Sequence, residues 1–140
     1  MELQEGTIIY TDQITKSELI SFVIKKCNEI YQEVGSGHLE SVYHRCLEHE
    51  LKLNNIPYES EIVLPIYYKN HYVGFGRADI VLYRNDPNRS IVIELKAQTG
   101  NFCYKDIHKA KFYMNSLNLD TGIMVNFPHF QTKECKFKLL

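Results

Sequence analysis

Residues 91–96 read IVIELK, and this stretch decides how the rest of the chain is organised. Three β-branched residues begin an apolar run that is typical of a central strand buried on both faces. Side chains alternate along a strand, so Glu94 and Lys96 point to the same face. Unpaired charge is costly to bury, so this face needs partner side chains or a metal ion. A salt-bridged strand end at an exposed edge is the simpler interpretation, and the flanking sequence must decide.

The flanking segments predict a mixed sheet packed against helices. Thr15 and Glu18 fit a capping box that begins a helix, and Gly35 can end it. The further expected elements are a helix over about 38–53, strands at 58–68 and 71–83 joined by a Lys69-Asn70 turn, a strand at 90–97, a helix over about 102–117, and strands at 121–127 and 135–140. The step from strand 90–97 to strand 121–127 has the length of a right-handed parallel crossover. The fold class is therefore α/β.

Two details of these elements can be tested against a structure. The apolar stripe of the second helix is expected to consist of Leu39, Val42, Tyr43, Cys46, Leu47 and Leu51. In strand 71–83, Val73, Phe75, Arg77, Asp79 and Val81 are expected on one face, and Gly74, Gly76 and Ala78 on the other. The second face lacks large side chains, so a helix is expected to approach it closely.

The overall composition favours an ordinary globular domain. The chain has 140 residues, and we expect a lead-in over 1–14, with a weak strand at 7–11, and a single domain over 15–140. Its formal charge of −1 argues against coating nucleic acid by bulk electrostatics but leaves room for a local basic groove. No apolar run is long enough to predict a membrane partner, and no secretory signal is visible.

The four cysteines point to a reducing compartment. They are scattered, with no CxxC pair, and Cys27, Cys46 and Cys103 fall in apolar-periodic segments as small core residues. This pattern disfavours a structural zinc site or a disulfide framework, and an intracellular location is expected.

Acidic side chains on neighbouring elements predict a metal site. Asp79 and Glu94 can be neighbours across the sheet, and two close carboxylates repel unless a cation lies between them. Hard oxygen ligands select Mg²⁺ or Mn²⁺, and the Leu95 carbonyl could complete the shell. Lys96 could then orient or deprotonate a water and stabilise a phosphate oxygen. Glu40 lies near a helix start, where an acid can be a simple stabiliser of the first turn.

These residues carry a resemblance to a known family. The pattern of Asp79 followed by Glu94 and Lys96 resembles the PD-(D/E)XK nuclease superfamily, and more narrowly the group named for a GxxExxY motif. That motif is present at residues 37–43. The remaining matching elements are Arg77-Ala78-Asp79, Glu94-Leu95-Lys96-Ala97, Tyr113, Gly122 and Asn126-Phe127, so the resemblance covers about residues 17–140.

The resemblance implies a restriction-endonuclease-like mixed β-sheet flanked by α-helices and a metal-dependent nuclease acting on DNA. It implies Glu40, Asp79 and Glu94 as catalytic metal ligands and Lys96 as the catalytic lysine. The candidate nucleic-acid contacts are Arg77, Lys105, His108, Lys109 and Tyr113, with Mg²⁺ or Mn²⁺ as cofactor. The sequence departs from the family at Lys109, where a Gln is usual, and at Asn70, where the hairpin usually has Gly.

Other functions stay open at this point. A catalytically silent nuclease-like module could grip nucleic acid or a protein partner without cutting it. A metal-dependent enzyme acting on another phosphate ester, or a subunit that needs a partner for substrate delivery, is a third reading. A small nuclease often dimerises to cut both strands, so a homodimer is also considered, although no coiled-coil pattern is present.

Overall fold

The computed structural model describes residues 13–140, so the expected lead-in strand at 7–11 lies outside the described residues. Its elements are α1 (Lys16–Val34), α2 (Glu40–Leu53), β1 (Tyr58–Tyr68), β2 (His71–Leu82), β3 (Ile91–Lys96), α3 (Tyr104–Ser116), β4 (Gly122–Asn126) and β5 (Lys136–Leu139). Every expected helix and strand within residues 13–140 is present, with ends that differ by two residues or fewer. None of the helices in this range combines the length and apolarity that crossing a bilayer requires.

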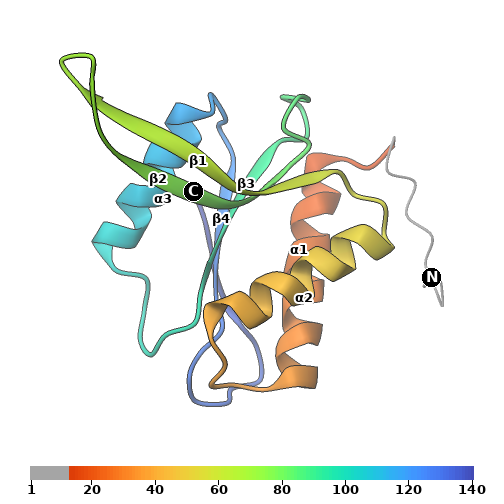
Figure 1. Cartoon of the computed structure of the whole chain (residues 1–140). Helices are drawn as coiled ribbons and strands as arrows, with labels where there is room; N and C mark the ends of the chain where they lie inside the picture. Colours follow the sequence, from red (N-terminus) through yellow and green to blue (C-terminus); the bar gives the residue numbers. More distant parts are fainter. Residues whose placement is uncertain (1–12) are drawn as a thin grey trace.

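Within residues 13–140, the sheet has five strands in the order β1-β2-β3-β4-β5. β3 and β4 are parallel, as the crossover through α3 predicts, and the other neighbours are antiparallel. Helices α1 and α2 pack on one face and α3 on the other (Figure 1). This is the predicted α/β fold, a mixed sheet flanked by helices.

The alternation of β3 divides its side chains between two apolar clusters. Ile91, Ile93 and Leu95 join the larger core under α1 and α2, whereas Val92 joins a smaller cluster with Tyr113 and Met114 of α3. All of β3 except Lys96 is buried. The strand is therefore the central layer that the sequence predicts, with Glu94 as a buried acid.

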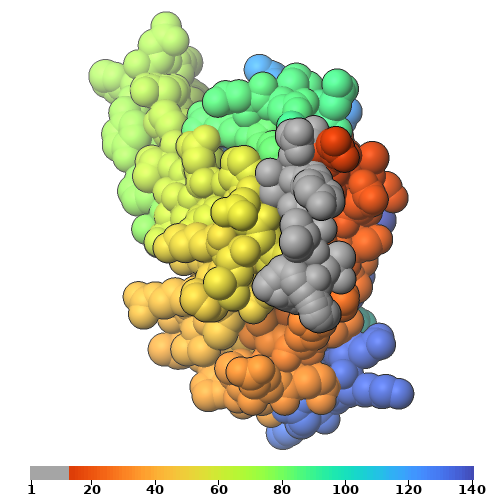
Figure 2. All heavy atoms as spheres, turned by 90° about the vertical axis from the view of Figure 1, so that its right-hand side faces the viewer, coloured from red at the N-terminus to blue at the C-terminus, as the bar shows by residue number. Residues whose placement is uncertain are grey.

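The β1–β2 hairpin extends beyond the helices. Its turn residues Lys69 and Asn70 both have positive φ, at 47° and 65°, as a tight hairpin turn requires. The tip projects from the body of the molecule in both views (Figures 1 and 2). Among residues 13–140, only α3 packs on this part of the sheet, and the opposite face of the hairpin carries exposed side chains.

Three sequence expectations fail locally. Leu39 is 77% exposed because α2 begins at Glu40 and Leu39 is only its cap, and Val42 is also exposed, so the buried stripe starts at Tyr43. Cys103 caps α3 and is exposed, so it is not a core residue. In β2, Ala78 and Val81 pack in the same cluster, so the predicted alternation of faces breaks at Asp79.

Candidate active site

The sheet forks where β2 and β3 carry their acids. The β2–β3 ladder ends at the pair Ile80 and Ile93. Beyond it, the Asp79 backbone N–H donates to Glu94 Oε2 and the Leu95 backbone N–H donates to Asp79 Oδ2, both at 2.8 Å. Two side-chain carboxylates therefore replace the next rungs of the ladder. Asp79 and Glu94 are neighbours across the sheet, as predicted.

This arrangement places two acids in one desolvated space. Glu94 is only 8% exposed. Burial, and after it repulsion by Asp79, raises the pKa of Glu94 to about 8. The hydrogen bond from the Asp79 backbone N–H favours the ionised form and partly opposes this rise. Burial also raises the pKa of Asp79, although the Leu95 N–H opposes it. The pair therefore retains a proton near neutral pH unless a cation replaces it.

Glu40 faces the same acids from the start of α2. Burial of its carboxyl group, then repulsion by Asp79, raises the pKa of Glu40, whereas Lys96 opposes the rise. A helix N-terminus alone would lower it. Desolvation and the repulsion by Asp79 therefore act against the helix dipole, which places the Glu40 carboxyl group within the electrostatic field of the fork.

Tyr43 fixes the turn that precedes Glu40. Its hydroxyl donates to the Gly35 carbonyl at 2.7 Å and accepts from the His38 backbone N–H at 3.3 Å. Its ring stacks on Phe127, with centroids 4.2 Å apart and planes 6° apart. Gly37 adopts φ 88° within the turn, a conformation that favours glycine. Residues of the GxxExxY pattern thus hold the start of α2 beside the end of β4.

Lys96 leaves the same strand as Glu94 and meets an acid that the sequence analysis missed. Its Nζ lies 3.3 Å from Asp106 Oδ1 in the first turn of α3. Burial opposes charge on Lys96, but Asp106 and Glu40 together raise its pKa. Lys96 is therefore held protonated. The sequence does place an acid, Asp106, in the first turn of the helix that follows the strand, and this position could have predicted a partner for Lys96.

Asn126 braces the loop after Lys96. This buried amide accepts from the Gln98 backbone N–H and donates to the Gln98 carbonyl, both at 3.0 Å. β4 runs parallel to β3, with Asn126 opposite Lys96. The brace therefore fixes the chain between the lysine and α3.

The predicted nucleic-acid contacts divide into exposed and buried residues. Arg77 is exposed and lies 3.5 Å from Glu61. Lys105, His108 and Lys109 are exposed on α3. Tyr113 is instead buried, and its ring packs directly on Gly76. A Cβ built on Gly76 would lie 2.6 Å from the ring, so only glycine leaves room for it. Its ring fills the space that the sequence left over Gly76, so it packs the helix on the hairpin and offers no open face to a ligand.

The oxygen atoms present fit a magnesium ion. Within residues 13–140, no three His, Cys, Asp or Glu side chains are gathered as they stand around one metal position. Asp79 and Glu94 each have one carboxylate oxygen without a hydrogen-bond donor in that range. Mg²⁺ in phosphate-processing sites is bound through one or two carboxylates, several waters and the substrate. The pair suits that ion better than a dedicated protein cage.

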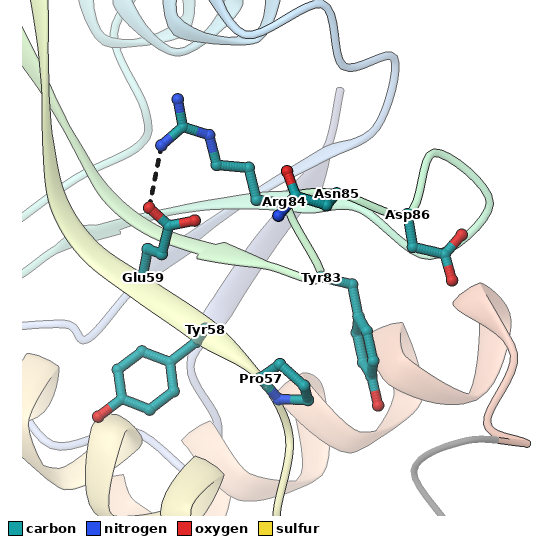
Figure 3. Close-up of a pocket in the computed structure, with 7 residues that line it drawn as sticks. All are labelled: Pro57, Tyr58, Glu59, Tyr83, Arg84, Asn85 and Asp86. Carbon is teal, nitrogen blue, oxygen red and sulfur yellow. Dashed lines mark hydrogen bonds and ion pairs between the residues drawn. The ribbon is translucent and has the colours of Figure 1, made fainter.

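A separate hollow of about 280 Å³ lies between the start of β1 and the segment that follows β2. It is lined by Pro57, Tyr58, Glu59, Tyr83, Arg84, Asn85 and Asp86 (Figure 3). Glu59 and Arg84 form an ion pair there at 2.9 Å. Arg89 holds the pKa of Asp86 below its ordinary value through a hydrogen bond. Glu59 and Asp86 therefore each form an ion pair with an arginine, whereas Asp79 and Glu94 form none among residues 13–140.

Comparison with known proteins identifies a family. A family model described as the PD-(D/E)XK nuclease superfamily matches residues 17–138, a range that includes all four predicted catalytic residues. No curated protein matches the chain. A crystal structure of a protein called SSO0001 is similar, with a TM-score of 0.51 and 25% identity, over 72% of this chain and 49% of that one. The chain thus spans about half the length of this solved relative.

Proposed function

The chain belongs to the PD-(D/E)XK nuclease superfamily, and on that premise we propose that it is a Mg²⁺-dependent nuclease that hydrolyses phosphodiester bonds of DNA. One observation carries the proposal. The carboxylates of Asp79 and Glu94 are held side by side in a buried fork, with Lys96 nearby, and neither carboxylate forms an ion pair with a basic side chain among residues 13–140. Structural acids are normally paired, so an unrelieved pair indicates a site that awaits a cation.

Asp79 and Glu94 would hold Mg²⁺ or Mn²⁺, together with the Leu95 carbonyl and, from the start of α2, Glu40. When bound, the ion lowers the pKa of a water and neutralises charge on the phosphate. The protein holds both carboxylates in place through backbone N–H groups of the opposite strand. This fixes the ligands before substrate arrives, so little reorganisation accompanies the reaction.

The charge state of Lys96 defines its role. Asp106 and Glu40 raise its pKa against the effect of burial, so at neutral pH it donates hydrogen bonds and does not accept a proton. We assign it to stabilising negative charge on the phosphate oxygens and not to general-base catalysis. Arg77, Lys105, His108 and Lys109 are exposed, and we assign them to contacts with phosphates of the DNA backbone.

Two finer assignments belong to this proposal. We place the chain in the group named for the GxxExxY motif, because Gly37, Glu40 and Tyr43 act together to position an acid at the fork. We also propose an intracellular location, because Cys135 Sγ donates to the Cys27 carbonyl at 3.5 Å and both cysteines are free thiols. A homodimer that cuts both strands is compatible with this proposal and is testable by light scattering.

Cleavage of plasmid and of labelled oligonucleotides, in Mg²⁺, Mn²⁺ or EDTA, tests the proposal. We expect metal-dependent cutting that Asp79→Ala and Lys96→Ala each abolish, while Glu59→Ala and Lys138→Ala, matched changes outside the fork, retain it. If the wild type binds DNA but cuts nothing with either metal, the protein is a silent nuclease-like module. If Lys96→Ala cuts normally, the assigned role of the lysine is wrong.

A further inference from the structure

The uncovered face of the β1–β2 hairpin is rich in exposed aromatic and apolar side chains. Tyr67 and Tyr72 are each 60% exposed, and Phe75 is 55% exposed. The two tyrosine rings meet edge to face, with centroids 6.1 Å apart. Exposing large rings in this way has a cost in water, so a clustered set of them indicates a ligand surface. We call the set Val63, Pro65, Tyr67, Tyr72, Phe75 and Arg77 the hairpin face.

The register of the hairpin brings these residues to one side. Val63 lies opposite Arg77, Pro65 opposite Phe75, and Tyr67 opposite Tyr72. Directly opposed residues share a face, and so do alternate residues along β1. A bulge between Ile66 and Tyr67 inserts one residue into β2. Without the bulge, Tyr72 would point to the α3 side, so the irregularity itself completes the aromatic row.

The outer part of the hairpin, beyond Glu61 and Asp79, carries basic side chains and no acids. Residues 62–78 contain Lys69, His71 and Arg77 but no Asp or Glu, in a chain whose net formal charge is −1. The Lys69 Nζ lies 5.4 Å from the centroid of the Tyr68 ring at the tip. Aromatic rings combined with cations and no acids are the complement of nucleic-acid bases joined by phosphates.

The hairpin face is continuous with the fork. Arg77 precedes Asp79 by two residues on the same strand, a step of about 7 Å along β2. Its guanidinium lies 3.5 Å from Glu61, in a pair whose side chains are both more than half exposed. A screened, exposed pair of this kind opens at little cost, so Arg77 is available to a phosphate. The aromatic row therefore leads toward the acids.

The edge of the hairpin disfavours a second protein strand as the occupant. β1 is the edge strand of the sheet, and Pro65 removes one backbone donor from it. Glu61 also has a positive φ of 52°, which interrupts the regular strand. The edge is thus blunted while the face stays open, and a face of rings accepts unstacked bases.

We propose that the hairpin face stacks the bases of single-stranded nucleic acid and leads that strand to the Asp79–Glu94 fork. The inference rests on the proposed nuclease function and narrows its substrate to single-stranded regions. Ring faces can stack only on bases whose own faces are free, whereas duplex bases are stacked on one another. A duplex would contact this part of the hairpin only through its basic residues, Lys69, His71 and Arg77.

Binding without cleavage tests this directly. In EDTA, fluorescence anisotropy compares a labelled mixed-sequence oligonucleotide alone with the same strand in a duplex. We expect tighter binding to the single strand. Tyr67→Ala and Phe75→Ala should each weaken it by roughly five- to a hundredfold, as expected for the loss of one stacked base. Phe75→Trp should retain affinity, and Phe130→Ala, which removes a still more exposed ring from the loop after β4, should leave it unchanged.

Equal affinity for duplex and single strand, or unchanged affinity in both alanine variants, would overturn the inference. If these variants alter the oligomeric state in light scattering and leave binding intact, the hairpin face is a contact between copies of the chain. The two proposals fail separately. If the wild type cuts duplex DNA and the alanine variants bind normally, only the single-strand inference is wrong. If the wild type binds single strands but never cuts, only the proposed nuclease activity is wrong.

Discussion

Strands β2 and β3 behave in opposite ways at their two ends. From Ile80 to Leu82, β2 pairs regularly with β3, and Ile93, Ile91 and Leu82 are fully buried in the larger core. One residue further, at Asp79 and Glu94, the ladder stops and carboxylates take its place. The same two strands thus gain stability at one end and hold unfavourable charge at the other.

The difference shows how a stable sheet can carry a destabilised site. Burial raises the pKa of Glu94 to about 8, so ionising it at the fork is unfavourable by several kcal/mol in the folded state. Adjacent apolar pairs in the core offset that cost. Strain of this kind can be kept only where the surrounding structure holds both strands firmly, so the paired end is a condition for the forked one.

Ile93→Ala at the paired end should have the largest effect. Ile93 is fully buried in the larger core, and its truncation leaves a cavity beside the fork. We expect the free energy of unfolding in urea to fall by about 2–5 kcal/mol. Ile66→Ala, the same change on the partly exposed hairpin, is the control and should cost much less. Equal losses would show that the paired end does not dominate stability.

Sequence reasoning reaches the paired end more completely than the forked one. Caps, turns and strand periodicity are local, so the capping box at Thr15, the Lys69-Asn70 turn and the burial of β3 are confirmed. The closeness of Asp79 and Glu94 follows from the hairpin and one short connection. Family resemblance supplied Glu40, whose place beside these acids depends on how Tyr43 packs on Phe127.

What the sequence could not supply depends on contacts between distant segments. Asp106 meets Lys96 only because α3 folds back over β3. Carboxylates take the place of ladder bonds where β2 stops pairing with β3 but continues to pair with β1, and the alternation of faces breaks there, at Asp79. Strand period alone does not predict where that pairing ends. Cys103 was misassigned because a helix-cap position and a core position can share the same apolar spacing.

Glu94→Gln should make the forked end resemble the paired one. An acid whose pKa is higher in the folded than in the unfolded protein loses stability as pH rises between the two values, here from the ordinary 4.5 to about 8. Gln keeps an oxygen that can accept from the Asp79 N–H but carries no charge. In metal-free buffer the variant should match wild type near pH 4 and exceed it increasingly up to pH 8, measured as thermal midpoints.

Glu59→Gln is the matched control, because it removes the same charge from β1, where Glu59 pairs with the exposed Arg84. It should show no gain that grows with pH. A Glu94→Gln midpoint at or below wild type at pH 8 would mean that the two carboxylates do not repel in the folded protein.

Metal should reverse the cost of the fork. A cation that replaces the shared proton stabilises the folded state, by about 2.7 kcal/mol at a hundred times its Kd. Binding must displace that proton, so stabilisation by Mg²⁺ or Mn²⁺ should be greater at pH 8 than at pH 5.5 and should vanish with EDTA. Calorimetry in two buffers of different ionisation heat would detect the released proton. Metal stabilisation that is equal in Asp79→Ala would place the ion elsewhere.

The smallest effect is expected from a change at Asp106, the acid that pairs with Lys96. Asp106→Asn removes the acid 3.3 Å from Lys96, so burial of the lysine is opposed by fewer acids, among them Glu40 and Glu94. The pKa of Lys96 should fall, so the alkaline limb of the cleavage rate should move to lower pH and kcat should drop by about tenfold, or 1.4 kcal/mol.

Asp120→Asn is the control, since Asp120 lies at the same 3.3 Å from Lys16 but is almost fully exposed. If both variants leave the pH profile unchanged, Asp106 only packs against Lys96. If Asp106→Asn lowers kcat with no shift of the alkaline limb, it positions the lysine without controlling its charge.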